Sequence, residues 1–267
     1  YNNFDSVIMT SATLTVDKKF NFFANRCGVN LIKKEKISFH HFLSSFDFKK
    51  QIQFLLPKGI SFKSLKKEKH FEESVKFLEK AIIASNGGAL VLCTSFEQVD
   101  QLYEKLVRPL SKKNIWLLRQ RRGGSPTSVI RDFTNDINSV LIGTETLWQG
   151  VDVPGESLRA LFIYKILYRR PDLPLIKARR EELDKKGQNG FSNYYEPLAA
   201  MALKQGFGRL IRKKTDTGIA VMLEDGLLDK PMLVNSLPDG VEPKRVDPSQ
   251  IYEMLAKLAE SINNKIS

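Results

Sequence analysis

Short apolar runs alternate with amphipathic stretches along the chain, and this alternation predicts a parallel sheet covered by helices. Strand-length apolar runs occur at 6–10, 88–94, 115–118, 139–143, 159–166 and 218–223. Helical spacing of apolar residues predicts helices at 96–107, 125–135, 173–186, 194–204 and 248–263. Pro109 is expected to end the helix that begins at Phe96, and Ser125-Pro126 suits a helix start.

The segment 16–85 is less regular than the rest of the chain. It contains an extended run at 51–57, a Lys-rich connection and a helical pattern at 71–84. We therefore predict one α/β domain, in which 1–85 is a strand plus an irregular flank or insertion and 86–267 is the main body.

Composition narrows the class of protein. An apolar content of 42% over 267 residues favours a globular fold over disorder. The longest apolar stretch, 158–167, is interrupted by Arg159 and Lys165, so no segment is expected to span a membrane. The chain opens with Tyr1 and lacks a basic-then-apolar signal pattern, which indicates a piece of a longer protein. Cys27 and Cys93 are distant in sequence, so we expect reduced thiols in a cytoplasmic compartment and no metal.

Charge points to a polyanionic partner. The net charge is +12, from 42 basic and 30 acidic residues, and such an excess raises affinity for nucleic acid. Several basic clusters are nevertheless expected to be ordinary solvated faces. The paired acids at 72–73 and 181–182 are interpreted in the same way, and His40, His41 and His70 as polar surface residues.

The segment KQGFGRLIR at 204–212 carries the most informative pattern. Arg209 and Arg212 are three residues apart, so on a helix they project from one face and two guanidinium groups can converge on a phosphate chain. Arginine stays charged and can neutralise the charge that develops on a leaving γ-phosphoryl group. Gly208 would allow close approach of a ligand to the backbone. The alternative is a surface helix with a basic tail.

A second informative segment, IGTETLWQGVDVPG at 142–155, follows a predicted buried strand. The hydroxyl groups of Thr144 and Thr146 and the free amides of the loop are neutral donors of the kind that position nucleic acid. Trp148 is placed to stack on a base, with core or hinge packing as an equal alternative. A plain turn between strand and helix is the alternative for the segment as a whole.

Two further patterns look like nucleotide sites and are rejected. The frame at 150–157 has the glycine spacing of a P-loop, but Glu156 replaces the lysine and Pro154 lacks an amide donor. The run VMLED at 221–225 resembles a strand ending in magnesium-binding acids, but no P-loop accompanies it. We interpret it as a structural strand end.

Taken together, four short motifs resemble those of superfamily-two helicases of the XPD-like group, specifically the C-terminal helicase domain of the bacterial DinG family. TSATL at 10–14 is similar to motif III, LCTSF at 92–96 to motif IV, 144–155 to motif V, and QGFGRLIR at 205–212 to motif VI. The segments 44–48, 165–167 and 171–174 also resemble the family. The order and spacing of the four motifs make chance assembly improbable.

The resemblance implies a RecA-like α/β fold, a parallel sheet with helices on both faces, which serves as the second motor lobe of an ATP-dependent DNA helicase. Residues 1–85 would then be the motif III strand plus a family-specific flank of that lobe. The residue roles implied are catalytic for Arg209 and Arg212, nucleotide-binding for Gln205, Gly208, Gly150 and Asp152, DNA-binding for Thr94, Ser95, Thr144 and Trp148, and coupling of hydrolysis to movement for Ser11 and Thr13.

The resemblance also implies what lies outside this chain. ATP with Mg²⁺ would be bound mainly by a first lobe of the same polypeptide, which in many family members also holds a 4Fe-4S cluster on four cysteines. The lobe would bind single-stranded DNA, and the whole protein would translocate from 5′ to 3′ as a monomer. It would act in DNA repair in the bacterial cytoplasm. The lobe alone would not hydrolyse ATP. The sequence departs from the family at Gln149 and at 224–226. Alternatives are a non-catalytic basic nucleic-acid-binding module and the helicase-like body of a DinG-type exonuclease.

Overall fold

The computed structural model describes residues 4–144, 147 and 156–266. In this part of the chain the centre is a seven-stranded sheet with the order β3-β4-β2-β5-β6-β1-β7, and every neighbouring pair is parallel. The strands are β1 (Ile52–Pro57), β2 (Ala89–Leu92), β3 (Leu117–Arg119), β4 (Val140–Gly143), β5 (Ala160–Ile163), β6 (Gly218–Met222) and β7 (Pro243–Val246). The predicted parallel α/β fold is confirmed.

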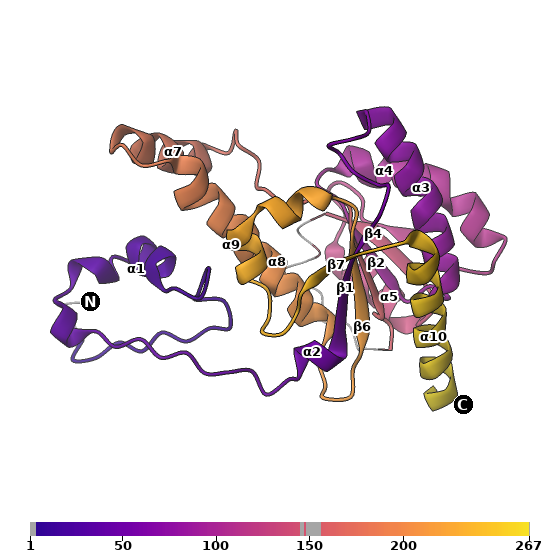
Figure 1. The fold of residues 1–267 in the computed structure, drawn as a ribbon, viewed down its shortest axis with the longest axis horizontal. Coiled ribbons are helices and arrows are strands. Elements are labelled where there is room, and N and C mark those ends of the chain that lie inside the picture. The colour runs from indigo at the N-terminus through magenta and orange to yellow at the C-terminus, as the bar shows by residue number, and fades with distance from the viewer. Residues whose placement is uncertain (1–3, 145–146, 148–155, 267) are drawn as a thin grey trace.

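Helices cover both faces of the sheet (Figure 1). One face carries α3 (Lys67–Ala84), α4 (Phe96–Ser111) and α10 (Pro248–Ile266). The other face carries α5 (Pro126–Asn135), α8 (Glu196–Leu210) and α9 (Pro231–Asn235). Buried on both faces, the strands need continuous apolar runs, which is why the sequence shows such runs rather than an apolar–polar alternation.

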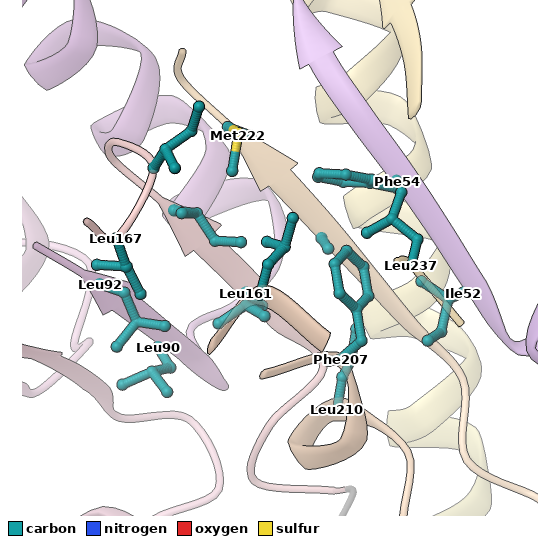
Figure 2. Close-up of a cluster of buried hydrophobic side chains, with 14 of the residues drawn as sticks. Ile52, Phe54, Leu90, Leu92, Leu161, Leu167, Phe207, Leu210, Met222 and Leu237 are labelled. Atoms are coloured by element: carbon teal, nitrogen blue, oxygen red, sulfur yellow. The ribbon is translucent and has the colours of Figure 1, made fainter. Parts of the chain in front are cut away.

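The core on the α8 face packs closely around two aromatic rings (Figure 2). Phe207 of α8 meets Phe54 of β1 edge to face, with ring centroids 4.8 Å apart and planes at 75°. Gly218, the first residue of β6, lets the end of α8 lie against the sheet, because a Cβ there would stand 2.5 Å from Cγ of Leu210. The sheet thus fixes the position of α8.

Two parts of the chain extend away from the sheet (Figure 1). The N-terminal part holds α1 (Asn21–Cys27) and the 3-10 turns η1 (Val29–Leu31) and η2 (Lys34–Lys36), and it reaches the sheet through α2 (Phe48–Gln51). The other part is α7 (Pro174–Lys185), which a π-helical segment, η3 (Phe191–Tyr195), connects to α8. A 3-10 segment, η4 (Asp225–Asp229), connects β6 to α9.

The predicted strand at 6–10 is wrong. These residues form no strand and are exposed, with Ile8 at 90%. A strand needs a neighbour to pair its backbone groups, and no described strand of this chain lies beside the segment. The apolar pattern at 6–10 predicted a buried strand, but within the described part of the chain these residues are exposed.

The interpretation of 16–85 as an irregular flank is also wrong in part. The run at 51–57 becomes β1, which pairs with β6 on one side and β7 on the other. The helix α3 packs against the core through residues such as Phe77 and Leu78. Both elements therefore belong to the main body of the domain, and the predicted boundary at 85–86 divides a single core.

Helix ends and one strand differ from prediction for local reasons. Pro109 does not end α4, which continues to Ser111, because a proline in the last turn removes only one hydrogen bond near a terminus. The strand β7 was missed because it is a partly exposed edge strand without an apolar run. No helix in the described part of the chain is long and apolar enough to cross a membrane.

Candidate functional site

A cavity of about 710 Å³ lies between the N-terminal segment and the helices α8 and α9. Thr13 from the N-terminal segment and Gln205, Gly208 and Arg209 from α8 line it together. The sequence placed these residues in separate motifs almost 200 positions apart. The fold therefore brings one predicted coupling residue (Thr13), two predicted nucleotide-binding residues (Gln205 and Gly208) and one predicted catalytic residue (Arg209) to one cavity.

The cavity has a strongly cationic lining. Its described lining includes one acid, Asp239, and the basic residues Lys18, Arg26, His41, Arg169, Lys204 and Arg209. Such an excess of positive charge in a concave site favours an anionic ligand. The sequence analysis assigned a role only to Arg209 of this set. Lys204 lies in the same segment, 204–212, and the other basic residues come from segments outside the four motifs.

Lys204 is half-buried at the wall of the cavity. Its Nζ donates a hydrogen bond to Oγ1 of Thr15 at 3.3 Å, which ties α8 to the N-terminal segment. Burial lowers the pKa of Lys204, because the desolvated ammonium group is less stable, and the charge of Asp239 opposes this shift. The N-terminal segment is also held to α9, because Ser236 Oγ accepts a hydrogen bond from the backbone N–H of Asp17 at 2.8 Å.

Gly208 is exposed, and a Cβ built on it meets no described atom within 4 Å. No packing contact inside the protein therefore requires glycine here. The backbone of α8 is therefore open to solvent at Gly208, and close approach of a ligand to it stays a prediction.

The prediction that Arg209 and Arg212 share one helical face is wrong. The helix α8 ends at Leu210, and the next residue, Ile211, is extended with φ −121° and ψ 115°. Arg212 therefore lies in the loop that leads to β6, and the described lining of the cavity includes Arg209 but not Arg212. The physical reason is that Ile211 is buried in the core below the helix, so the chain must turn towards the sheet.

The residues predicted to touch DNA lie at the carboxyl edge of the sheet. Thr94 and Ser95 follow β2 and are exposed. They begin α4 by a reciprocal cap, in which the N–H of Gln98 donates to Ser95 Oγ and the N–H of Thr94 donates to Gln98 Oε1, both at 3.2 Å. This arrangement presents both hydroxyl groups at the start of a helix.

Thr144 lies next to this edge, because β2 pairs with β4 and the N–H of Cys93 donates to the carbonyl of Gly143 at 2.8 Å. Thr144 is buried, however, and its N–H and Oγ1 both donate to Oε1 of Gln120, at 2.8 and 3.0 Å. The expectation that these donors are free is therefore wrong. Thr144 instead joins the ends of β4 and β3.

Arginines and a lysine flank the same edge of the sheet. Arg122 lies over the ring of Phe96, 5.7 Å from its centroid, next to the start of α4. Lys165, which follows β5, lies 4.9 Å from the centroid of the Phe62 ring. Arg119 is instead paired with Asp100 at 2.7 Å and is less available for a ligand.

Several predicted residues lie elsewhere. Gly150, Asp152 and Trp148 fall outside the described residues, as do Thr146 and Gln149. Ser11 is exposed, and its Oγ accepts a hydrogen bond from the N–H of Thr13 at 3.3 Å, so the two residues form a local turn. Thr13 lines the cavity and Ser11 does not, among the residues that the structure describes.

The acids after β6 are structural, as predicted. Glu224 is largely buried, and its Oε2 accepts a hydrogen bond from the N–H of Ile166 at 2.7 Å. Burial raises the pKa of Glu224. Asp225 accepts hydrogen bonds from Ser61 at 2.6 Å and from Arg245 at 3.3 Å.

The interpretation of His70 as a surface residue is wrong. Its side chain is fully buried in α3, 3.5 Å from the ring centroid of Phe62, and its Nε2 lies 3.1 Å from the carbonyl oxygen of Leu223. Burial lowers the pKa of His70, because the charged imidazolium is poorly solvated. Helical spacing from His70 to Ser74, Leu78 and Ala81 could have revealed this burial from the sequence.

Both remaining histidines, His40 and His41, are exposed, as predicted. Cys27 and Cys93 form no disulfide within the described part of the chain. Among the described residues no group of three or more His, Cys, Asp or Glu side chains is placed to hold a metal ion.

Comparisons with known proteins agree on the class of this chain. Residues 78–244 match the family model described as the helicase C-terminal domain. The 3'-5' exonuclease DinG of Bacillus subtilis is 32% identical over 222 residues, and the ATP-dependent DNA helicase YoaA of Haemophilus influenzae is 33% identical over 221 residues. These alignments cover 82% and 83% of this chain but only 24% and 33% of those relatives.

Solved structures show the same fold. S. tokodaii Xpd4 superposes with a TM-score of 0.55 at 13% sequence identity. The superposition covers 80% of this chain and 42% of that protein.

Proposed function

Because the chain belongs to the helicase C-terminal domain family, with DinG and YoaA among its relatives, we propose that it is the second motor lobe of an ATP-dependent DNA helicase. The observation that carries the proposal is the cationic cavity in which Thr13 meets Gln205 and Arg209. In this cavity a residue of motif III, proposed to couple hydrolysis to movement, lies with residues of motif VI, proposed to bind phosphate. The chain spans about a quarter to a third of its relatives, so the activity of the whole protein is part of the proposal.

ATP fits the charge and the donors of this cavity. Arg209 and Lys204 supply positive charge, and Gln205 supplies an amide that can donate to or accept from the nucleotide. Arg212, on the loop after α8, would reach the γ-phosphate from beyond the end of the helix. A first lobe of the same polypeptide would supply the P-loop and hold Mg²⁺, which would help to neutralise the charge of the phosphates when bound.

Single-stranded DNA would follow the carboxyl edge of the sheet, where parallel α/β folds commonly bind ligands. Thr94 and Ser95 would contact phosphates with their hydroxyl groups, and Arg122 and Lys165 would add positive charge. Closure and opening of the two lobes would move the strand, from 5′ to 3′ as the family implies. Trp148, Gly150 and Asp152 keep the roles proposed from the sequence.

Substituting the arginines of the full-length, two-lobe protein tests the proposal. Arg212→Ala and Arg209→Ala should each lower the DNA-stimulated ATPase rate by about 10³-fold, the magnitude of an arginine finger. Arg179→Ala is the matched control, because Arg179 is exposed on α7 and paired with Glu182 at 3.1 Å. If Arg212→Ala and Arg209→Ala both stay within about twofold of the wild type, a basic nucleic-acid-binding module becomes the better description.

The isolated chain should show no ATP hydrolysis, because the proposed P-loop lies in the other lobe. An exonuclease is the second candidate, since one relative carries that name. Degradation of 3′-labelled DNA by the full-length protein, unaffected by Arg212→Ala, would favour this candidate over a motor.

A further inference from the structure

Gln51 holds the loop that follows motif VI from a distance of more than 160 residues in sequence. Its side chain is 6% exposed at the junction of α2 and β1. Nε2 donates to the backbone carbonyls of Lys213 at 3.0 Å, Lys214 at 3.2 Å and Asp216 at 2.9 Å. The two N–H groups of this amide are therefore shared among three carbonyls of the segment between α8 and β6.

Asp216 holds the same loop through its amides. Its Oδ2 accepts hydrogen bonds from the backbone N–H groups of Arg212 at 2.8 Å and Lys213 at 2.7 Å. The backbone N–H of Asp216 in turn donates to the carbonyl of Lys213 at 3.1 Å. The Asp216 carboxylate thus holds the backbone N–H of Arg212, and the Gln51 amide holds backbone carbonyls of the residues that follow.

This double attachment replaces the support that a helix would give. Since α8 ends at Leu210, Arg212 lies beyond the helix, and its backbone N–H donates to Asp216. Gln51 can act as a rigid support, because the next residue, Ile52, is the first of β1 and pairs in register with Gly218 of β6. The loop is therefore anchored to two adjacent strands of the core.

Burying the Gln51 amide at this position costs free energy of folding, and a residue that only filled the space would not need an amide. Its Oε1 is buried without a hydrogen-bond partner among the described residues, and a buried acceptor left in this state costs about 1–3 kcal/mol. An apolar side chain of similar size would avoid that cost. What the amide provides instead is a donor group that holds three carbonyls of the loop.

We propose that Gln51 and Asp216 are positioning residues for Arg212, and that they hold its backbone so that the guanidinium group reaches the phosphates of ATP. The inference rests on the proposed function of Arg212. Neither residue touches the nucleotide in this scheme. Each acts through the loop, so loss of either one should weaken catalysis while leaving binding of ATP and DNA nearly intact.

The test uses the full-length, two-lobe protein with single-stranded DNA. Gln51→Leu should lower kcat for DNA-stimulated ATP hydrolysis about 10- to 100-fold, as expected when a catalytic group is misplaced by about 1 Å, with KM for ATP and Kd for DNA within about threefold. Gln53→Leu is the matched control, because Gln53 lies two residues further along the chain, on β1, with an exposed side chain, and should keep the wild-type rate.

A double variant separates positioning from general damage. If Gln51 acts only through Arg212, the variant Gln51→Leu/Arg212→Ala should be no slower than Arg212→Ala alone. Asp216→Ala should reproduce the kcat loss from the more exposed side of the loop. It therefore provides the same test if Gln51→Leu proves too unstable to assay.

The outcomes distinguish failure of the proposed function of Arg212 from failure of the positioning role of Gln51 and Asp216. If Arg212→Ala itself leaves the ATPase within about twofold, the proposed function of Arg212 fails. If Arg212→Ala is inactive but Gln51→Leu and Asp216→Ala keep kcat within about twofold, only the positioning role is overturned. Losses that multiply in the double variant would overturn it equally, because they would show that Gln51 acts independently of Arg212.

Discussion

Replacing Arg159 with methionine should destabilise the protein by about 3–5 kcal/mol, because it leaves several buried hydrogen-bond acceptors without a donor, each at a cost of about 1–3 kcal/mol. Arg159 is fully buried at the start of β5. Its Nε donates to the carbonyl of Ser85 at 2.9 Å, its Nη2 to Asn86 O and Asn138 Oδ1 at 2.6 Å, and its Nη1 to Glu156 O at 3.2 Å. Methionine keeps the volume of the side chain and removes all four donors.

The magnitude follows from two opposing effects. Each acceptor left unsatisfied in a buried position costs about 1–3 kcal/mol, and Ser85 is itself 1% exposed. Relief of the buried charge offsets part of this cost, because burial lowers the pKa of Arg159 to about 10 and so shows that the charged form is poorly solvated. At pH 7 the guanidinium remains protonated, so the lost hydrogen bonds dominate.

Urea unfolding followed by circular dichroism measures the difference directly, and thermal unfolding should show a Tm lower by about 6–20 °C for a domain of this size. Arg179→Met is the matched control, since the exposed pair of Arg179 with Glu182 contributes about 0–1 kcal/mol. Should Arg159→Met unfold within about 1 kcal/mol of the wild type, the four hydrogen bonds would carry no net stability, and the reasoning would be refuted.

Three further predictions concern other parts of the fold. Phe207→Ala should cost about 3–5 kcal/mol in urea unfolding, because it empties the ring site against Phe54, and a loss under about 1 kcal/mol would contradict the packing of α8. The pKa of His70 lies below 6.5, so stability should be full above pH 6.5 and fall as pH decreases, by up to about 1.4 kcal/mol per pH unit; His70→Gln should lack this component in a pH series of unfolding curves. Ser95→Ala should lower stability by about 0.5–2 kcal/mol through loss of the α4 cap, and an unchanged urea midpoint would show that Gln98 alone suffices.

The alternation of apolar runs and helical patterns was sufficient to predict the fold class. The runs that became β2, β4, β5 and β6 are local, continuous and buried on both faces, so their pattern carries the information by itself. The helices α5, α7 and α10 could likewise be predicted from the sequence, because the spacing of apolar residues is visible within each segment. The motifs likewise indicated the family that the comparisons show.

Positions that depend on distant partners were beyond this kind of reasoning. The exposure of 6–10 and the pairing of β1 between β6 and β7 both depend on which segment lies beside them. For the candidate site, no pattern along the chain indicates that Thr13 lines the same cavity as Gln205, or that Lys204 and Arg26 do.

The sequence by itself determined which segments must be buried and which residue types can meet phosphate, because both follow from local composition and spacing. Only the tertiary structure decided that α8 stops before Arg212 and that Gln51 holds the loop beyond it. The physical reason is that hydrogen bonds between residues more than 160 positions apart are set by strand order and packing, which leave no periodic trace along the chain.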